Sequence, residues 1–176
     1  DKAAKISDED SEVYHHLTAK LLYLSKRARP DLQTAVAFLC KRVKQPDVDD
    51  WKKLGRCVRY LQGSADLFLT LEADGSGGIQ WWIDASFAVH PDMKSHTGIT
   101  MSVGKGSPCS SSTGQKLNTK SSTEAELAGV DDGVSVIIWT WNFLIEQGHE
   151  AKDNGVCQDN QSAILLERTG QALIHI

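Results

Sequence analysis

The sequence predicts a mixed α/β domain preceded by a small three-helix segment, and the hydrophobic pattern changes at Gly63. Before Gly63, apolar residues recur at helical spacing. After it, short runs of β-branched and aromatic residues alternate with glycine-rich turns, and helical stretches follow. Strands and helices that share one sheet are typical of a mixed α/β layout. We therefore expect a helical segment over residues 1–63 and an α/β domain over residues 64–176.

Three short helices are expected in the first segment. Leu17, Leu21 and Leu24 recur near the 3.6-residue period of a helix. Pro30 ends this pattern and suits the first turn of a second helix. The third helix is expected to end at Gly63, because glycine is favoured at helix C-termini.

The second segment is expected to form a sheet with two helices. The expected strands cover residues 67–71, 79–89, 97–103, 109–119 and 156–158. The first four read as an antiparallel meander. Ser121-x-x-Glu124 is a capping-box pattern that predicts a long helix ending at Gly148, with Gly133 as a candidate interruption. Asn160 can cap a last helix.

The net charge of −4 conceals a basic segment next to an acidic one. Residues 11–63 carry eleven Lys and Arg against five Asp and Glu, whereas residues 64–176 carry six against fourteen. This asymmetry indicates a nucleic-acid-binding arm beside a metal-binding body, and the alternative is a solvated basic helix face. The expected nucleic-acid contacts are Arg27, Arg29, Lys41, Arg42, Lys52, Lys53, Arg56 and Arg59.

Composition argues against a membrane protein and against a disulfide-rich secreted domain. No stretch approaches the ~18 apolar residues that a membrane span requires. The first residues open into acids and do not form a signal peptide. The four cysteines lie far apart without metal-ligand spacing, which favours a reducing, intracellular compartment, either cytoplasmic or nuclear.

Three carboxylates could converge. Asp84 lies in the most apolar expected strand, on the face of Trp82 and Ser86, where a charge is costly unless it is paired or bound to a metal. Glu126 lies near the start of the long helix, and Asp159 follows the last strand at a β-to-α junction. The alternative for Asp84 is a strand-end acid that faces solvent, and for Glu126 an acid that complements the helix dipole. For Asp159 it is a helix N-cap acid or a turn residue.

Together the three acids suggest a site for hard cations such as Mg²⁺, which prefer oxygen ligands. Two such ions ~3.5–4 Å apart clamp the attacking and leaving oxygens of a phosphodiester displacement. His90 and His96 flank a nearby loop and are interpreted as solvated loop histidines rather than phosphate contacts.

The order of the motifs resembles the ribonuclease H region of copia-type retrotransposon polyproteins. The motifs that carry this resemblance lie at residues 83–92, 94–98, 117–127 and 158–163. Upstream, residues 21–25, 29–31 and 58–63 resemble the helical end of that family's reverse transcriptase. The resemblance covers most of the chain. It implies a ribonuclease H-like mixed sheet flanked by helices.

The resemblance also implies a function. Asp84, Glu126 and Asp159 would hold two Mg²⁺ ions, or Mn²⁺, that activate a water and cut the RNA strand of an RNA–DNA hybrid during reverse transcription. Ser86, Asn160 and Gln161 would lie near the substrate, where the 2′-hydroxyl distinguishes RNA. The implied partners are the hybrid and the remainder of the polyprotein, with no membrane.

The chain departs from the family pattern in two respects. It lacks the paired-aspartate polymerase motif, so no polymerase activity is expected. The family continues with a further strand and a fourth acidic position, so we expect a fragment whose ribonuclease H-like domain is incomplete at its C-terminus. The alternatives are a catalytically inactive retrotransposon remnant that at most binds nucleic acid, and a scaffold with no nucleic-acid role.

Overall fold

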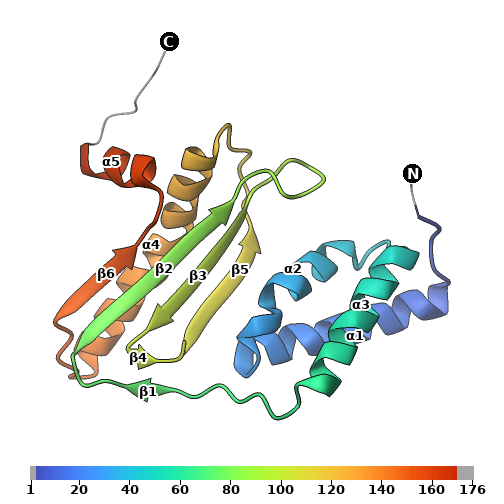
Figure 1. The fold of residues 1–176 in the computed structure, drawn as a ribbon, viewed down its shortest axis with the longest axis horizontal. Coiled ribbons are helices and arrows are strands. Elements are labelled where there is room, and N and C mark those ends of the chain that lie inside the picture. The colour runs from blue at the N-terminus through green and yellow to red at the C-terminus, as the bar shows by residue number, and fades with distance from the viewer. Residues whose placement is uncertain (1–2, 170–176) are drawn as a thin grey trace. The chain divides into compact units, whose positions relative to one another are not determined.

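The computed structural model describes residues 3–169, and the chain divides into two compact units, residues 1–69 and 70–176 (Figure 1). We call these the helical unit and the α/β unit. Each has its own cluster of buried apolar side chains. None of the described helices combines the length and the apolar character needed to cross a membrane.

The helical unit contains the three expected helices. They are α1 (Asp8–Arg27), α2 (Gln33–Arg42), which follows the short 3₁₀ turn η1 (Pro30–Leu32), and α3 (Val48–Gly63). Ser7 caps α1 by accepting a hydrogen bond from the backbone N–H of Asp10, and Asp47 opens α3 in a capping box. The buried core consists of Tyr14, Leu21, Leu32, Val36, Leu39 and Leu54.

The α/β unit is built on a mixed four-stranded sheet. Its elements are β1 (Glu72–Ala73), β2 (Gly78–Ser86), β3 (His96–Ser102), β4 (Gly104–Lys105), β5 (Cys109–Gly114), α4 (Ser122–Glu146), β6 (Asp153–Cys157) and α5 (Gln161–Thr169). The strand order is β5-β3-β2-β6, with β6 parallel to β2 and the other pairs antiparallel. This confirms the expected mixed α/β layout and the meander over β2, β3 and β5.

Strict alternation along β2 decides which side chains can form a site. Ile79, Trp81 and Ile83 are buried on the face that α4 covers (Figure 1). Asp84 and Ser86 are exposed on the opposite face, together with the neighbouring Trp82. The predicted sharing of one face by these three residues is confirmed, because strand side chains alternate with a period of two.

Helix α4 runs without interruption through Gly133, so the break considered at this glycine is absent. The glycine instead allows close packing, because a Cβ atom there would lie 2.8 Å from Ile83 Cδ1. Ser121 accepts the N-cap hydrogen bond from Glu124 N. The Glu124 carboxylate accepts from Lys120 N, one residue before the cap, rather than from the cap residue itself.

The prediction of a strand over residues 67–71 is wrong. This segment is not a strand in the structure, and Phe68 is 81% exposed. Only the following Glu72 and Ala73 pair, with Lys105 and Gly104 of β4. A strand requires a neighbour that bonds its N–H and C=O groups, and an apolar run does not supply one.

His90 and His96 are buried, so their interpretation as solvated loop residues is wrong. They are 3% and 6% exposed. His90 Nε2 lies 3.0 Å from His96 Nδ1, and His96 Nε2 lies 2.7 Å from Ser112 Oγ on the neighbouring strand β5. Polar rings can be buried because hydrogen bonds replace their contacts with water.

Candidate active site

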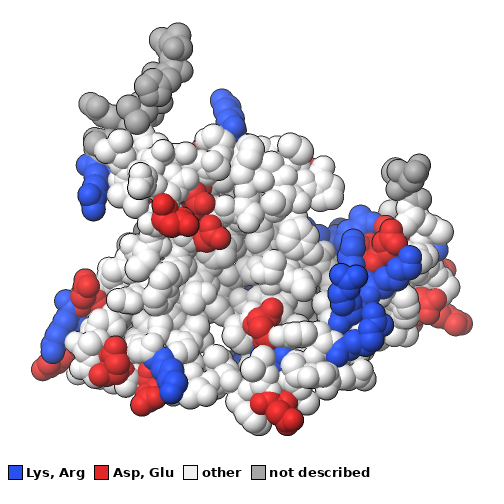
Figure 2. All heavy atoms as spheres, viewed as in Figure 1, with Lys and Arg blue, Asp and Glu red and all other residues white. Residues whose placement is uncertain are grey.

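The structure brings Asp84, Glu126 and Asp159 together. Each offers one carboxylate oxygen, and the three oxygens lie within 4.8 Å of one another. Asp84 lies on β2, Glu126 in the second turn of α4, and Asp159 in the turn between β6 and α5. On the face shown in Figure 2, acidic side chains gather near α5.

Strand register explains why two of these acids meet. Trp82 of β2 is paired with Cys157 of the parallel strand β6. Asp84 and Asp159 each lie two residues beyond this pair, at the same end of two adjacent strands. The β-to-α junction after a parallel strand is a frequent place for ligand sites in α/β sheets.

The third acid differs from the other two in burial. Glu126 is only 5% exposed, whereas Asp84 and Asp159 are exposed. Burial raises the pKa of Glu126, and the nearby charges of Asp84 and Asp159 raise it further. Hydrogen bonds from Gln158 and from the backbone of Ala85 lower this pKa.

Gln158 is a member of the site that the sequence analysis did not single out. Its Nε2 donates to Glu126 Oε2 at 3.2 Å, and its Oε1 accepts from Asn160 N at 2.9 Å. A neutral amide beside an acidic motif carries no charge signal in a sequence. Its role becomes visible only when the helix and the strand are placed side by side.

The donor set fits a hard divalent cation. Mg²⁺ binds oxygen ligands at ~2.0–2.1 Å, so two ligands on opposite sides of one ion are about 4.2 Å apart. Three carboxylate oxygens within 4.8 Å are close to that spacing. Two of the three carboxylates are exposed, so a polyanionic substrate could also reach them.

The residues expected near the substrate lie around these acids. Ser86 is exposed at the end of β2, on the same face as Asp84. Asn160 Oδ1 caps α5 by accepting from Ala163 N at 3.0 Å, and its side-chain amide nitrogen could donate to a substrate. Gln161 is the exposed first residue of α5.

Lys and Arg side chains gather over the helical unit, with acidic side chains among them (Figure 2). Arg29 is not available for nucleic acid. It forms two hydrogen bonds to Asp31, at 2.9 and 3.0 Å, and two more to Ser64, and its side chain is 8% exposed. The expected nucleic-acid contact at Arg29 is therefore corrected to a structural role. It links the 3₁₀ turn η1 to Ser64 at the end of α3.

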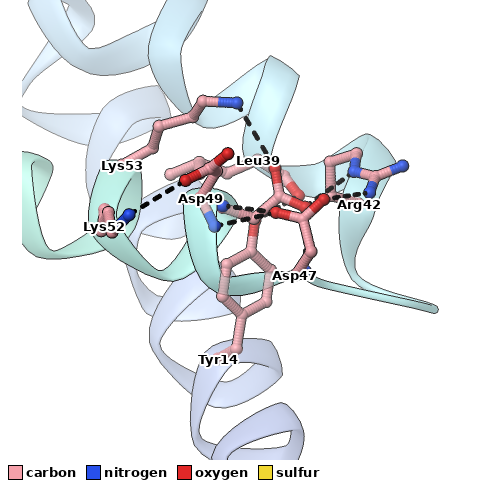
Figure 3. Close-up of polar contacts among 8 residues, drawn as sticks. Tyr14, Leu39, Arg42, Asp47, Asp49, Lys52 and Lys53 are labelled. Atoms are coloured by element: carbon pink, nitrogen blue, oxygen red, sulfur yellow. Dashed lines mark hydrogen bonds and ion pairs between the residues drawn. The ribbon is translucent and has the colours of Figure 1, made fainter. Parts of the chain in front are cut away.

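Three more of the expected contacts are engaged by acids near the start of α3 (Figure 3). The ion pairs are Arg42–Asp47 at 3.0 Å, Arg42–Asp50 at 2.8 Å, Lys52–Asp49 at 3.1 Å and Lys53–Asp50 at 3.6 Å. Arg27 lies over the ring of Tyr23, 5.7 Å from its centroid. Within the described residues, Lys41, Arg56 and Arg59 are exposed and form no ion pair.

The fold and the site together define a mixed α/β domain that carries a carboxylate cluster suited to a divalent cation. Homologues of the chain are retrovirus-related Pol polyproteins from plant transposons. It is 31% identical over 157 residues to the Pol polyprotein from transposon TNT 1-94 of Nicotiana tabacum. It is 33% identical over 140 residues to the Pol polyprotein from transposon RE2 of Arabidopsis thaliana. The expected resemblance to retrotransposon polyproteins is confirmed at this level.

The alignments cover most of the chain but little of the polyproteins. They span 88% and 79% of the chain, and 12% and 10% of the two relatives. The chain is also 27% identical over 127 residues to secreted RxLR effector protein 161 of Plasmopara viticola, which covers 89% of that protein. No protein-family model matches the chain, and no solved structure matches it significantly.

Proposed function

We propose that the α/β unit is a ribonuclease H-like domain that hydrolyses the RNA strand of RNA–DNA hybrids in a divalent-cation-dependent reaction. The observation that carries this proposal is the convergence of Asp84, Glu126 and Asp159 within 4.8 Å. The order of their motifs, which resembles that of copia-type ribonuclease H, and the relatedness to Pol polyproteins support it.

Asp84, Glu126 and Asp159 would hold two Mg²⁺ ions, for which Mn²⁺ could substitute. When bound, these cations supply Lewis-acid chemistry that stabilises the charge developing on the phosphodiester oxygens. The chain contributes the arrangement of its carboxylates: two exposed acids at the ends of neighbouring strands and one buried acid held by hydrogen bonds. Cations at this position would also offset the negative charge that otherwise repels a polyanion.

Three side chains beside the acids are proposed to position the hybrid. Ser86 would offer a hydroxyl on the face of Asp84, and Asn160 and Gln161 would offer amide groups at the start of α5. Hydroxyl and amide groups can bond the sugar 2′-OH, which is present only in RNA. We assign the selectivity for the RNA strand to these three side chains.

The helical unit is proposed to contribute phosphate contacts. Among the expected contacts, the best candidates are those that are exposed and form no ion pair within the described residues, namely Lys41, Arg56 and Arg59, with Arg27 over Tyr23. Contacts of this kind supply affinity without sequence preference. Because the relatives are much longer polyproteins, we also propose that the remainder of such a polyprotein is a partner.

The test is cleavage of a hybrid whose RNA strand is labelled at its 5′ end. The chain with Mg²⁺ is expected to shorten the RNA strand, and EDTA or Asp84→Asn to abolish the reaction. Asp131→Asn is the matched control, because Asp131 is an exposed acid on α4 outside the cluster. Salt-sensitive binding of the hybrid without cleavage in Mg²⁺ or Mn²⁺ would favour the inactive binding protein instead.

A further inference from the structure

We propose that Gln158 is a positioning residue that orients the Glu126 carboxylate for cation binding. The inference rests on the proposed function of the carboxylate cluster. Gln158 is half-buried in the turn between β6 and α5, next to Asp159. It is a neutral side chain placed among three acids.

The contacts of Gln158 join all three elements that carry the acids. Its Nε2 donates to Glu126 Oε2 of α4 at 3.2 Å and lies 3.5 Å from the carbonyl oxygen of Ile83 on β2. Its Oε1 accepts from Asn160 N at 2.9 Å. Ile83 directly precedes Asp84, and Asn160 directly follows Asp159. One side chain therefore contacts the Glu126 carboxylate and the backbone beside Asp84 and beside Asp159.

These contacts engage both ends of the side-chain amide. A glutamine amide has two N–H donors. Nε2 lies within hydrogen-bond distance of both Glu126 Oε2 and the Ile83 carbonyl oxygen, and the oxygen accepts from Asn160 N. The side chain is consequently held in one orientation. Such a constrained amide is suited to fixing its partner and unsuited to contacting a substrate.

Glu126 is the acid that needs this support. It is buried, and a buried carboxylate is costly unless hydrogen bonds replace its lost hydration. Its donors are Gln158 and the backbone N–H of Ala85. Both act on the carboxylate from within the α/β unit and restrict its rotation. Removing a hydrogen-bond partner of a metal-binding carboxylate typically weakens metal affinity by about 10–100-fold.

The experiment measures Mn²⁺ binding by calorimetry in the full chain, without any nuclease assay. Gln158→Met keeps the length of the side chain and removes both donors. It is expected to weaken Mn²⁺ binding about tenfold or more while leaving the circular dichroism spectrum unchanged. Gln80→Met is the matched control, because Gln80 is an exposed glutamine on β2 outside the cluster, and it should bind as the unaltered chain does. Gln158→Leu serves as the second variant if methionine disturbs the fold.

A double-mutant cycle separates positioning from a general structural role. In the Glu126→Gln background, Gln158→Met should change the residual Mn²⁺ affinity less than threefold, because the carboxylate that it orients is gone. An equal loss in both backgrounds, or an unchanged affinity in Gln158→Met alone, would overturn the inference while leaving the proposed function intact. Absence of Mn²⁺ binding by the unaltered chain would overturn both.

Discussion

Gly133 of α4 faces Ile83 of β2 so closely that a methyl group on the glycine would lie 2.8 Å from Ile83 Cδ1. Ile99 Cδ1 would be 3.4 Å away. Ile83 directly precedes Asp84, and Glu126 lies two turns before Gly133 on the same helix. The absence of a side chain at Gly133 therefore helps to set the spacing between two elements of the carboxylate cluster.

Gly133→Ala is expected to destabilise the chain by about 1 kcal/mol, because overpacking of ~1–3 kcal/mol exceeds the ~1 kcal/mol that alanine adds to a helix. In an Ile83→Val background, the clashing Cδ1 atom is absent. In that background, Gly133→Ala should increase the free energy of unfolding by about 0.5–1 kcal/mol. Urea unfolding of the four chains measures this change of sign. Equal destabilisation in both backgrounds would argue against the contact.

Glu126→Gln is expected to raise the stability of the chain in EDTA at neutral pH, because it removes a buried charge. Burial is the main cause that raises the pKa of Glu126 above the usual value of a glutamate carboxyl. The folded state therefore binds the proton more tightly than the unfolded state. The stability of the unaltered chain is highest below the pKa of Glu126 in the unfolded state, and it decreases as pH rises through the higher pKa of the folded state. The stability gain of the variant should accordingly grow from pH 4.5 upwards.

Unfolding midpoints between pH 4 and pH 8 check this expectation. Mn²⁺ provides the second arm of the measurement. It should raise the midpoint of the unaltered chain more than that of Glu126→Gln, since a ligand that binds the folded state stabilises it. A pH-independent difference between the two chains would contradict the assignment to Glu126.

Arg29→Met is expected to lower the stability of the helical unit by about 2 kcal/mol, because it removes the hydrogen bonds of a buried guanidinium to Asp31 and Ser64. Arg27→Met is the matched control. Arg27 is exposed and near in sequence, so its substitution should stay within ~0.5 kcal/mol. The Arg29 hydrogen bonds hold the pKa of Asp31 below its usual value, so this stabilisation is present at neutral pH and is lost as pH falls below 3.8. Chemical denaturation followed at pH 7 and pH 3 measures both effects.

Arg56→Gln and Arg59→Gln are expected to weaken hybrid binding in EDTA. Both side chains are exposed and form no ion pair within the described part of the chain. Each should reduce the slope of log affinity against log salt by about 1, as expected for loss of one phosphate contact. Fluorescence anisotropy at several salt concentrations measures the slope. Lys152→Gln, an exposed lysine of the α/β unit, is the control, and an equal effect there would contradict a specific role for α3.

Much of the fold follows from local patterns in the sequence. The period-two alternation of β2 placed Asp84 correctly on the face of Ser86, and Ser121 caps α4 as its motif predicts. The failures have a common cause. Residues 67–71 have strand-like composition but no strand partner. His90 is a polar residue in a loop, yet it is buried against His96. Pairing and burial depend on neighbours that are distant in the sequence.

The sequence by itself determined which acids could form the site, because each follows from a strand end or a helix start within its own motif. Only the tertiary structure decided that Asp84, Glu126 and Asp159 meet within 4.8 Å, since this depends on the parallel pairing of β2 with β6 and the packing of α4. It also decided that Arg29 joins the 3₁₀ turn η1 to the end of α3. Charge can be read along a chain, but the partner of a charge is set by the folding of remote segments onto one another.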